Sequence, residues 1–266
     1  MSRSLLNDRD RHLTMDRDFL VRVYGDSLSL PRQSEGVHHS QTYPELLVAA
    51  LKHQAPEAEI TIYNRSYSDA NAVRLSETYR SDAFYFGRPG GDIAILQCGI
   101  VDCAPRPLPS KVRSIVSRLP APIRDRIVSF IHANRASMLR SGLIWRVTPP
   151  KLFLDTFTAT LKLAAPDFSR IYVINIAPTT PATEARSPGL SESIRHYNSL
   201  IAEAVCAAAA TNMSVIDVHK IISSQPGEIE DFVSRIDGHH ISAAAHRLYA
   251  DAILAHERQH WQIPTR

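Results

Sequence analysis

The sequence predicts an α/β protein whose central parallel sheet, of about five strands, is covered by helices on both faces. Short runs rich in Val, Ile and Tyr alternate along the chain with amphipathic segments of helical periodicity. This alternation indicates a parallel sheet, because parallel strands need a long crossover and a helix usually forms it. Apolar residues make up 44 % of the 266 residues, which is enough for a globular core. The predicted strands are 19–24, 59–63, 92–97, 170–175 and 213–217.

Helices are predicted between and after these strands. The segment 44–53 follows the first strand, and the long segment 190–210 precedes the last one. Isoleucine recurs every four positions across 123–131, which places three apolar side chains on one face of a helix. The final helix is predicted to begin at Ser242, because serine caps helix N-termini well.

The whole chain, 1–266, is expected to fold as a single domain. Residues 1–17 carry charges throughout and are interpreted as an N-terminal extension. The stretch 106–166 is long and rich in proline, so we expect a helical insertion that can act as a lid. Ligands of open parallel sheets bind at the carboxyl ends of the strands. The residues directly after the strands are therefore the first candidates for function.

Composition excludes several classes of function. Lys and Arg number 30 against 27 Asp and Glu, and a net charge of +3 is too small to predict a nucleic-acid partner. We expect no cofactor, because the chain has neither a dinucleotide-binding glycine motif nor a Walker-type phosphate loop. We also expect no metal, because Cys98, Cys103 and Cys206 suit neither a zinc site nor a disulfide framework.

The sequence predicts a cytoplasmic protein with reduced thiols. Its first residues lack the apolar core of a signal peptide. No stretch approaches the roughly 18 consecutive apolar residues that span a bilayer. The oligomeric state is left open.

Two short motifs combine residue types that suit nucleophilic catalysis. Gly25-Asp26-Ser27 directly follows the first strand, where a tight turn exposes a serine hydroxyl at the edge of the sheet. Asp237 and His240 lie just before the last helix. A hydroxyl needs a base such as histidine at neutral pH, and a carboxylate on the other ring nitrogen fixes the tautomer. The alternative is two ordinary turns, the second beside exposed histidines.

Together the two motifs resemble the SGNH (GDSL-type) hydrolases, a family of lipases, esterases, thioesterases and carbohydrate deacetylases. Gly25-Asp26-Ser27-Leu28 is similar to the family's first block, and 237–253 is similar to its ending. The resemblance covers most of the chain and implies a flavodoxin-like three-layer α/β/α sandwich. It also implies that Ser27 is the nucleophile, His240 the base and Asp237 the residue that orients the base.

The middle blocks depart from the family pattern. Asp69 stands where the family has a glycine whose N–H helps to form the oxyanion hole. In Gly99-Ile100-Val101-Asp102, Val101 replaces an asparagine whose side chain normally donates to the oxyanion. We expect Asp69 to keep the backbone donor, because aspartate tolerates a positive φ better than most residues. The amides of Asn64 and Asn175, at the ends of two strands, are candidates to replace the missing donor.

Arg106 follows the third block and is predicted at the mouth of the same cleft. There it would bind an anionic group of the substrate or supply positive charge to the oxyanion. The alternative is an exposed arginine that only contacts solvent.

These features predict a serine hydrolase that cleaves a carboxylic ester, an acetyl ester or a thioester through an acyl-enzyme. The expected partner is a small-molecule ester, with an acylated sugar among the candidates, and fold-level analogy does not choose between them. Two alternatives stay open. Val101 and Asp69 favour a degenerate protein that binds a glycan or acyl ligand, and a sugar O-acyltransferase would use the same serine and histidine.

Overall fold

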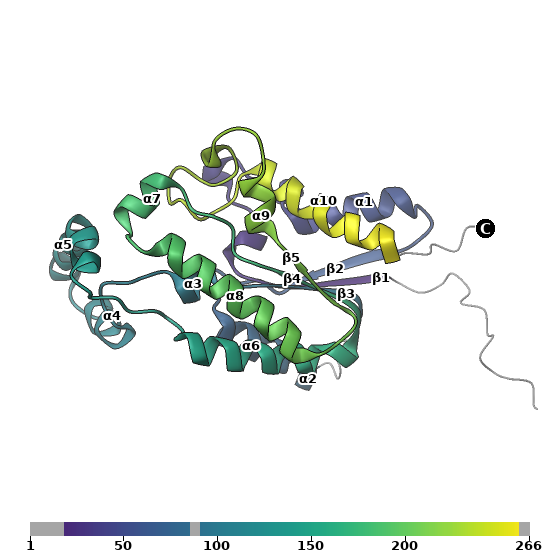
Figure 1. Ribbon diagram of the computed structural model, residues 1–266, viewed down its shortest axis with the longest axis horizontal. Coiled ribbons are helices and arrows are strands. Elements are labelled where there is room, and N and C mark those ends of the chain that lie inside the picture. The colour runs from purple at the N-terminus through teal and green to yellow at the C-terminus, as the bar shows by residue number, and fades with distance from the viewer. Residues whose placement is uncertain (1–18, 86–90, 261–266) are drawn as a thin grey trace, which may run out of the picture.

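A five-stranded parallel sheet lies between two layers of helices (Figure 1). The computed structural model describes residues 19–85 and 91–260. The strand order is β2-β1-β3-β4-β5, and all four pairings are parallel. The predicted flavodoxin-like sandwich is confirmed by this order. The strands are β1 (Phe19–Tyr24), β2 (Ile60–Asn64), β3 (Gly91–Gln97), β4 (Phe168–Ile174) and β5 (Met213–Ile216).

The predicted strands are all present, with ends that differ from the prediction by at most two residues. The predicted N-terminal extension, 1–17, lies outside the described residues. Because successive side chains of a strand point to opposite faces, Val21 and Val23 pack on one side of the sheet. Ala94 and Leu96 pack on the other side. The sheet is therefore buried on both faces.

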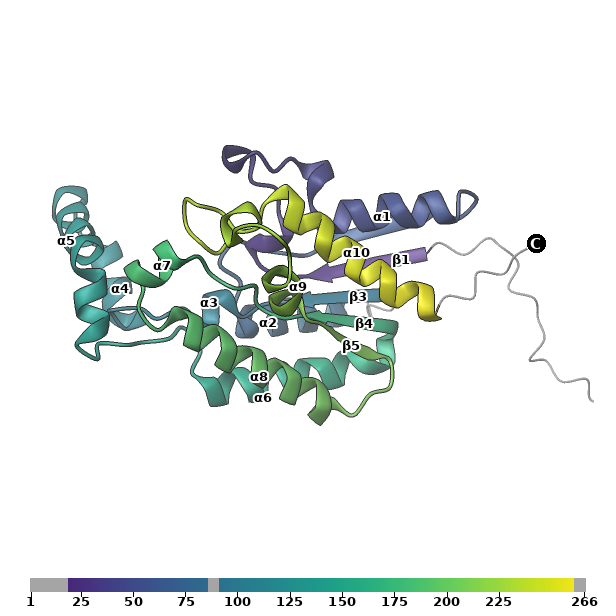
Figure 2. The ribbon, with the colours of Figure 1, turned by 45° about the horizontal axis from the view of Figure 1, so that its top comes forward.

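Two sets of helices cover these faces (Figure 2). Helices α1, α9 and α10 pack on the face of Val21 and Val23, and α2, α3, α6 and α8 pack on the opposite face. Ser242 lies directly before α10, and its hydroxyl accepts a hydrogen bond from the N–H of Ala245, as predicted for an N-cap. The bounds are α1 (Tyr43–Gln54), α2 (Ala72–Tyr85), α3 (Ile100–Cys103), α6 (Pro150–Ala164), α8 (Leu190–Ala208), α9 (Val218–Ser223) and α10 (Ala243–His260).

Residues 106–149, here called the arm, extend away from the body of the molecule beyond the carboxyl ends of the strands (Figures 1 and 2). The arm contains α4 (Ser110–Ser117) and α5 (Ala121–Arg140), and Leu139 is the only buried residue of α5. The isoleucine-rich helix predicted across 123–131 is part of α5, but Ile123 is 53 % exposed because no other layer packs against it.

The remainder of the predicted insertion 106–166 belongs to the sandwich. Helix α6 places Phe153, Phe157 and Leu161 in the core against α2 and α8. The segment that projects is thus shorter than the one predicted from proline content, since prolines at 149 and 150 begin a core helix. No helix within the described ranges is both long enough and apolar enough to cross a membrane.

Candidate active site

Ser27 lies directly after β1, at the edge of the sheet where the loops after β1 and β3 converge. It begins a short 3-10 turn, Ser27–Ser29, and the side chain of Asp26 caps that turn by accepting a hydrogen bond from the N–H of Leu28 at 2.9 Å. Ser29 ties the turn to β3, because its hydroxyl donates to Gln97 Oε1 at 3.0 Å. The backbone around Ser27 is therefore held from both sides.

Asp237 and His240 lie in the loop between α9 and α10. Gly238 allows this loop to form, since its φ is +72° and a Cβ there would come within 1.7 Å of the Thr183 hydroxyl. The carbonyl of Gly238 accepts a hydrogen bond from Thr179 Oγ1 at 2.7 Å. The loop is thereby attached to the segment that follows β4.

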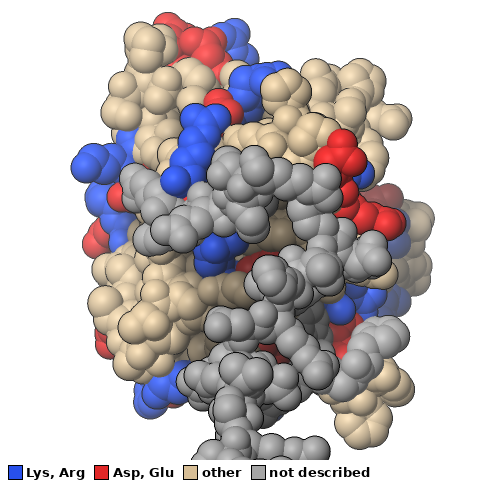
Figure 3. Space-filling model, turned by 90° about the vertical axis from the view of Figure 1, so that its right-hand side faces the viewer, with Lys and Arg blue, Asp and Glu red and all other residues tan. Residues whose placement is uncertain are grey.

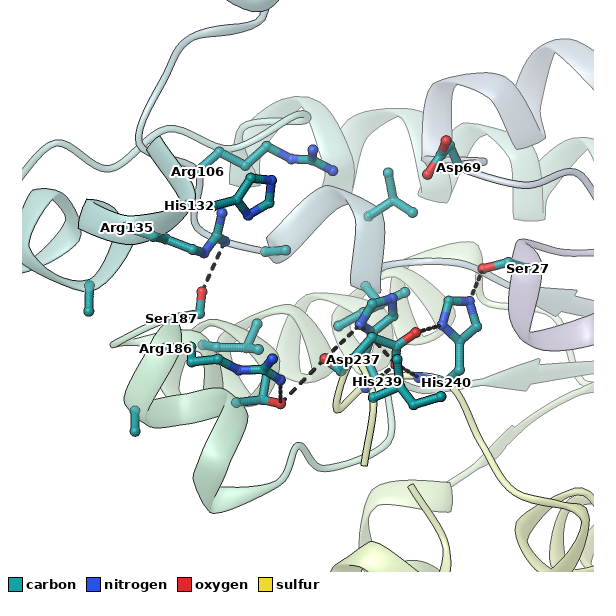
Figure 4. A pocket seen from close by; sticks show the side chains of 18 of the residues that line it. Ser27, Asp69, Arg106, His132, Arg135, Arg186, Ser187, Asp237, His239 and His240 are labelled. Carbon is teal, nitrogen blue, oxygen red and sulfur yellow. Dashed lines mark hydrogen bonds and ion pairs between the residues drawn. The ribbon is translucent and has the colours of Figure 1, made fainter. Parts of the chain in front are cut away.

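Ser27, His240 and Asp237 form one hydrogen-bonded chain (Figure 4). Ser27 Oγ lies 2.8 Å from His240 Nε2, although 213 positions separate the two residues. His240 Nδ1 lies 2.5 Å from Asp237 Oδ2. Because an ionised carboxylate only accepts, Nδ1 carries the proton and donates it to Asp237. Nε2 then carries no proton, and its lone pair faces the serine hydroxyl.

Asp237 is held as a carboxylate. Partial burial alone raises the pKa of Asp237, but the hydrogen bond from the His240 ring and the N–H of His240 outweigh this effect. The pKa of Asp237 is therefore well below its usual value. Its other oxygen, Oδ1, accepts from the N–H groups of His239 at 3.1 Å and His240 at 3.0 Å. These contacts fix the carboxylate in the plane where it meets Nδ1.

Arg32 contacts the same hydrogen-bonded chain of side chains, a contact that no sequence pattern indicated. Its Nη1 lies 2.9 Å from His240 Nε2, and its Nη2 lies 3.4 Å from Asp237 Oδ2. A guanidinium has only donors, so Nε2 is the acceptor in this contact and is deprotonated. Arg32 is in turn bound by the carboxylate of Glu35. Only the folded loop 30–38, in which Arg32 pairs with Val37, brings the guanidinium to the histidine.

Asp69 adopts the backbone conformation that the replaced glycine would favour. Its φ is +60°, in the left-handed region, and it lies with Ser27 in the wall of one cavity. Among the described residues, no hydrogen-bond acceptor pairs with the backbone N–H of Asp69 or of Ser27. Neither N–H group is therefore engaged within the described part of the chain.

Gly99 and Val101 lie at the carboxyl end of β3. Gly99 has a φ of +131°, and a Cβ there would come within 2.7 Å of Ile176, so only glycine fits this turn. Val101 lines the cavity with a side chain that has no donor. The asparagines proposed to replace that donor do not line this cavity, so this expectation is wrong. The amide of Asn64 donates to the Ser29 carbonyl, and that of Asn175 donates to Asp217.

The cavity that contains Ser27 has a volume of about 650 Å³. Arg106 lies in its wall, together with residues from α5 and from α7 (Pro181–Arg186). Figure 4 shows the hydrogen-bonded chain at one end of the cavity and arginines at the other. Arg135 and Arg186 are the two further arginines of this wall, and nothing in the sequence placed either of them near Ser27.

Two other groups of side chains offer weaker candidates. Burial raises the pKa of the Cys98 and Cys103 thiols, so neither is a ready thiolate. Asp237, His239 and His240 have ligand atoms within 4.8 Å of one another, a spacing that also suits a metal ion. Both ring nitrogens of His240 are already paired, with Asp237 and with Ser27, so the hydrogen-bonded chain is the better interpretation.

Asp26 is fully buried beside Ser27, and only one of its carboxylate oxygens has a partner among the described residues. Burial, together with the nearby charge of Asp102, raises the pKa of Asp26 to about 7 against the opposing hydrogen bond from the N–H of Leu28. The folded protein therefore holds a proton on Asp26 that the unfolded chain releases near pH 4.

We expect the free energy of unfolding to fall as the pH rises from about 4 through about 7, because Asp26 loses its proton in this window. Asp26→Asn keeps an acceptor for the N–H of Leu28 and cannot ionise. Between pH 5 and pH 8 its free energy of unfolding should therefore fall by about 2 kcal/mol less than that of the wild type. Urea unfolding at the two pH values measures this difference. Equal losses in wild type and variant would show that Asp26 is already ionised in the folded protein.

Comparisons with known proteins support the fold. No family model matches the sequence, and no curated protein matches it either. Among solved structures, the chain is similar to a lipase/acylhydrolase from Enterococcus faecalis, with a TM-score of 0.63, 13 % identity and coverage of 93 % of this chain and 99 % of the other.

Two further solved structures have a similar fold. A member of the lipolytic G-D-S-L family from Veillonella parvula has a TM-score of 0.55 and 13 % identity, over 89 % of this chain and 97 % of the other. An acetylxylan esterase from Geobacillus stearothermophilus has a TM-score of 0.56 and 14 % identity, over 90 % and 93 %. The chain therefore has the SGNH/GDSL-type hydrolase fold.

Proposed function

We propose that the protein hydrolyses an ester of a small molecule, with Ser27 as nucleophile, His240 as general base and Asp237 as the carboxylate that orients the base. The observation that carries the proposal is the 2.8 Å contact between Ser27 Oγ and His240 Nε2. This distance is within the range for direct proton transfer between a nucleophile and its base. The esterases among the structural neighbours favour the same general activity.

In the first half of the reaction, Ser27 Oγ attacks the ester carbonyl carbon while its proton moves to His240 Nε2. The new Oγ–C bond gives a tetrahedral intermediate, and Asp237 stabilises the imidazolium through Nδ1. The C–O bond to the alcohol then breaks, and His240 gives its proton to the departing oxygen. In the second half, water repeats these steps and releases the acid from Ser27.

The backbone N–H groups of Ser27 and Asp69 are our candidates for the oxyanion hole. Both are without a partner in the described part of the chain, and both residues line the cavity. Val101 removes the side-chain donor that the family pattern places here. The absence of one such donor typically costs ~10²–10³ in kcat, so a slower enzyme is expected rather than an inactive protein.

A fluorophosphonate probe combined with an acetate-release assay tests the proposal. We expect the probe to label the wild-type protein and not Ser27→Ala, and 4-nitrophenyl acetate to be hydrolysed in water alone. Turnover that needs a sugar acceptor would instead identify an O-acyltransferase. Absence of both labelling and turnover would leave a protein that only binds a glycan or acyl ligand. The cytoplasmic location stays a prediction from the sequence.

Arg32 is expected to slow the acylation step. Its Nη1 competes with the Ser27 hydroxyl for the lone pair of His240 Nε2, and its positive charge opposes the imidazolium. Removing a charge at this distance changes the energy of the protonated ring by roughly 1–4 kcal/mol. We therefore expect kcat of Arg32→Gln to rise about tenfold, measured with 4-nitrophenyl acetate.

A matched control for this experiment is Arg235→Gln, because Arg235 is an exposed arginine whose ion pair is with Asp231. Its kcat should equal that of the wild type. A fall in kcat for Arg32→Gln would mean that the guanidinium holds His240 in place rather than competing for its nitrogen.

A further inference from the structure

The end of the cavity remote from Ser27 is lined by arginines from three separate segments. Arg106 follows α3, Arg135 lies on α5, and Arg186 ends α7. Figure 4 shows all three on the side of the cavity opposite Ser27 and His240. A fourth, Arg113 of α4, lines an adjoining cavity of about 320 Å³ that shares Arg106 and Arg135 with the first.

These guanidinium groups have no carboxylate partner among the described residues. Arg135 Nη2 donates to the Pro105 carbonyl at 2.5 Å and to Ser187 Oγ at 3.0 Å. Arg186 Nη2 donates to Thr183 Oγ1 at 3.0 Å. Neutral oxygens hold the side chains in place without cancelling their charge. The remaining N–H donors of both groups are thus positioned and unneutralised.

Arg106 is the least satisfied of the three. Its Nε is buried and has no hydrogen-bond partner in the described structure. Burial lowers the pKa of Arg106, and the charges of Arg113 and Arg135 lower it further, although the charge of Asp69 acts in the opposite direction. Burial likewise lowers the pKa of Arg135, with added repulsion from Arg113 and Arg186. A bound anion would relieve this repulsion and supply the missing acceptor.

Basic residues are also concentrated in the part of the chain that forms the arm and this wall of the cavity. Residues 106–146 contain nine Lys and Arg and one acidic residue, Asp125, whereas the rest of the chain holds 21 basic and 26 acidic residues. At the opposite end of the molecule, where the strands begin, the visible surface mixes both signs (Figure 3). The resulting field draws anionic molecules toward the arm and the cavity beneath it.

We propose that the substrate carries a phosphate group, which binds Arg106, Arg135 and Arg186 while its ester bond lies at Ser27. This inference rests on the proposed function and names the class of ester. Several guanidinium groups in one wall suit a phosphate, because it offers about two negative charges and several acceptor oxygens to paired N–H donors. A lone carboxylate would match one arginine and leave the others repelling each other.

Inhibition by inorganic phosphate and pyrophosphate tests the proposal at constant ionic strength. We expect both to compete with an acetylated sugar phosphate as substrate, and the inhibition constant for pyrophosphate to rise at least tenfold in Arg106→Gln. Arg126→Gln is the matched control, because Arg126 is exposed on α5 and lines neither cavity. Its inhibition constant should not change. Equal weakening in both variants, or no inhibition of an active wild-type enzyme, would overturn the proposal.

Calorimetric titration of Ser27→Ala with pyrophosphate separates this inference from the proposed function. Binding that Arg106→Gln weakens at least tenfold in this background supports the anion site even in a protein without turnover. If Ser27→Ala does not bind pyrophosphate while the wild-type protein hydrolyses 4-nitrophenyl acetate, the anion site is rejected and the esterase activity stands. Circular dichroism establishes that each variant is folded.

Two pairs of esters then identify the source of the phosphate. We expect kcat/KM for an acetylated sugar phosphate to exceed that for the same acetylated sugar at least tenfold, and the ratio to approach one in Arg106→Gln. A short-chain phosphatidic acid, compared with the matching diacylglycerol, tests a lipid phosphate in the same way. Ratios near one for both pairs in the wild type would contradict recognition of a phosphorylated substrate.

Discussion

Ser27→Ala is expected to lower kcat by about 10⁶. The alanine has no oxygen to form the acyl-enzyme, and His240 then has no hydroxyl from which to accept a proton. Because the two side chains act as one unit, His240→Ala and the double variant should lose about the same factor as Ser27→Ala alone. Initial rates with 4-nitrophenyl acetate measure all three.

Ser199→Ala is a suitable control, because Ser199 is exposed on α8 and its hydroxyl donates to the His196 carbonyl of the same helix. Its kcat should match the wild type. If Ser27→Ala and His240→Ala lost independent factors that multiply in the double variant, the two residues would not share one proton transfer. A Ser27→Ala protein that kept full activity would remove the serine from the mechanism altogether.

Asp237→Asn is expected to lower kcat by about 10⁴ with little change in the fold. The asparagine can present its NH₂ group to His240 Nδ1, which then becomes the acceptor. The proton moves to Nε2, and the ring can no longer take the proton of Ser27. Rates of acetate release and of fluorophosphonate labelling should fall together, because both depend on the same nucleophile.

The control for this substitution is Asp251→Asn, since Asp251 is exposed on α10 and carries the same change of charge. It should leave kcat unaltered. A loss of less than tenfold in Asp237→Asn would mean that another group orients His240. Arg32 is the side chain to test in that case, because it contacts both Asp237 and His240.

The sequence was sufficient to predict the strands of the sheet and the two loops that carry Ser27 and His240. Strand composition and helix periodicity are properties of neighbouring residues, so the five strands and the N-cap at Ser242 could be found without coordinates. The backbone at Asp69 was also foreseeable, because a residue that replaces glycine in a turn must accept its dihedral angles.

Other expectations failed where long-range contacts decide the outcome. Proline content marked 106–166 as an insertion, but packing against α2 and α8 draws α6 into the core. Asn64 ends β2, as expected, and Asn175 directly follows β4. Their hydrogen bonds to Ser29 and Asp217 direct them elsewhere, and neither partner is apparent from strand position.

By itself, then, the sequence determined the layered α/β architecture and which residues have the chemistry of a nucleophile, a base and its carboxylate. Only the tertiary structure decided which of them meet: Ser27 with His240 across 213 positions, Arg32 with both members of the His240–Asp237 pair, and three arginines in one wall. The reason is physical. Local conformation follows from adjacent side chains and backbone sterics, whereas a cavity and its charges arise from segments that come together only when the core packs.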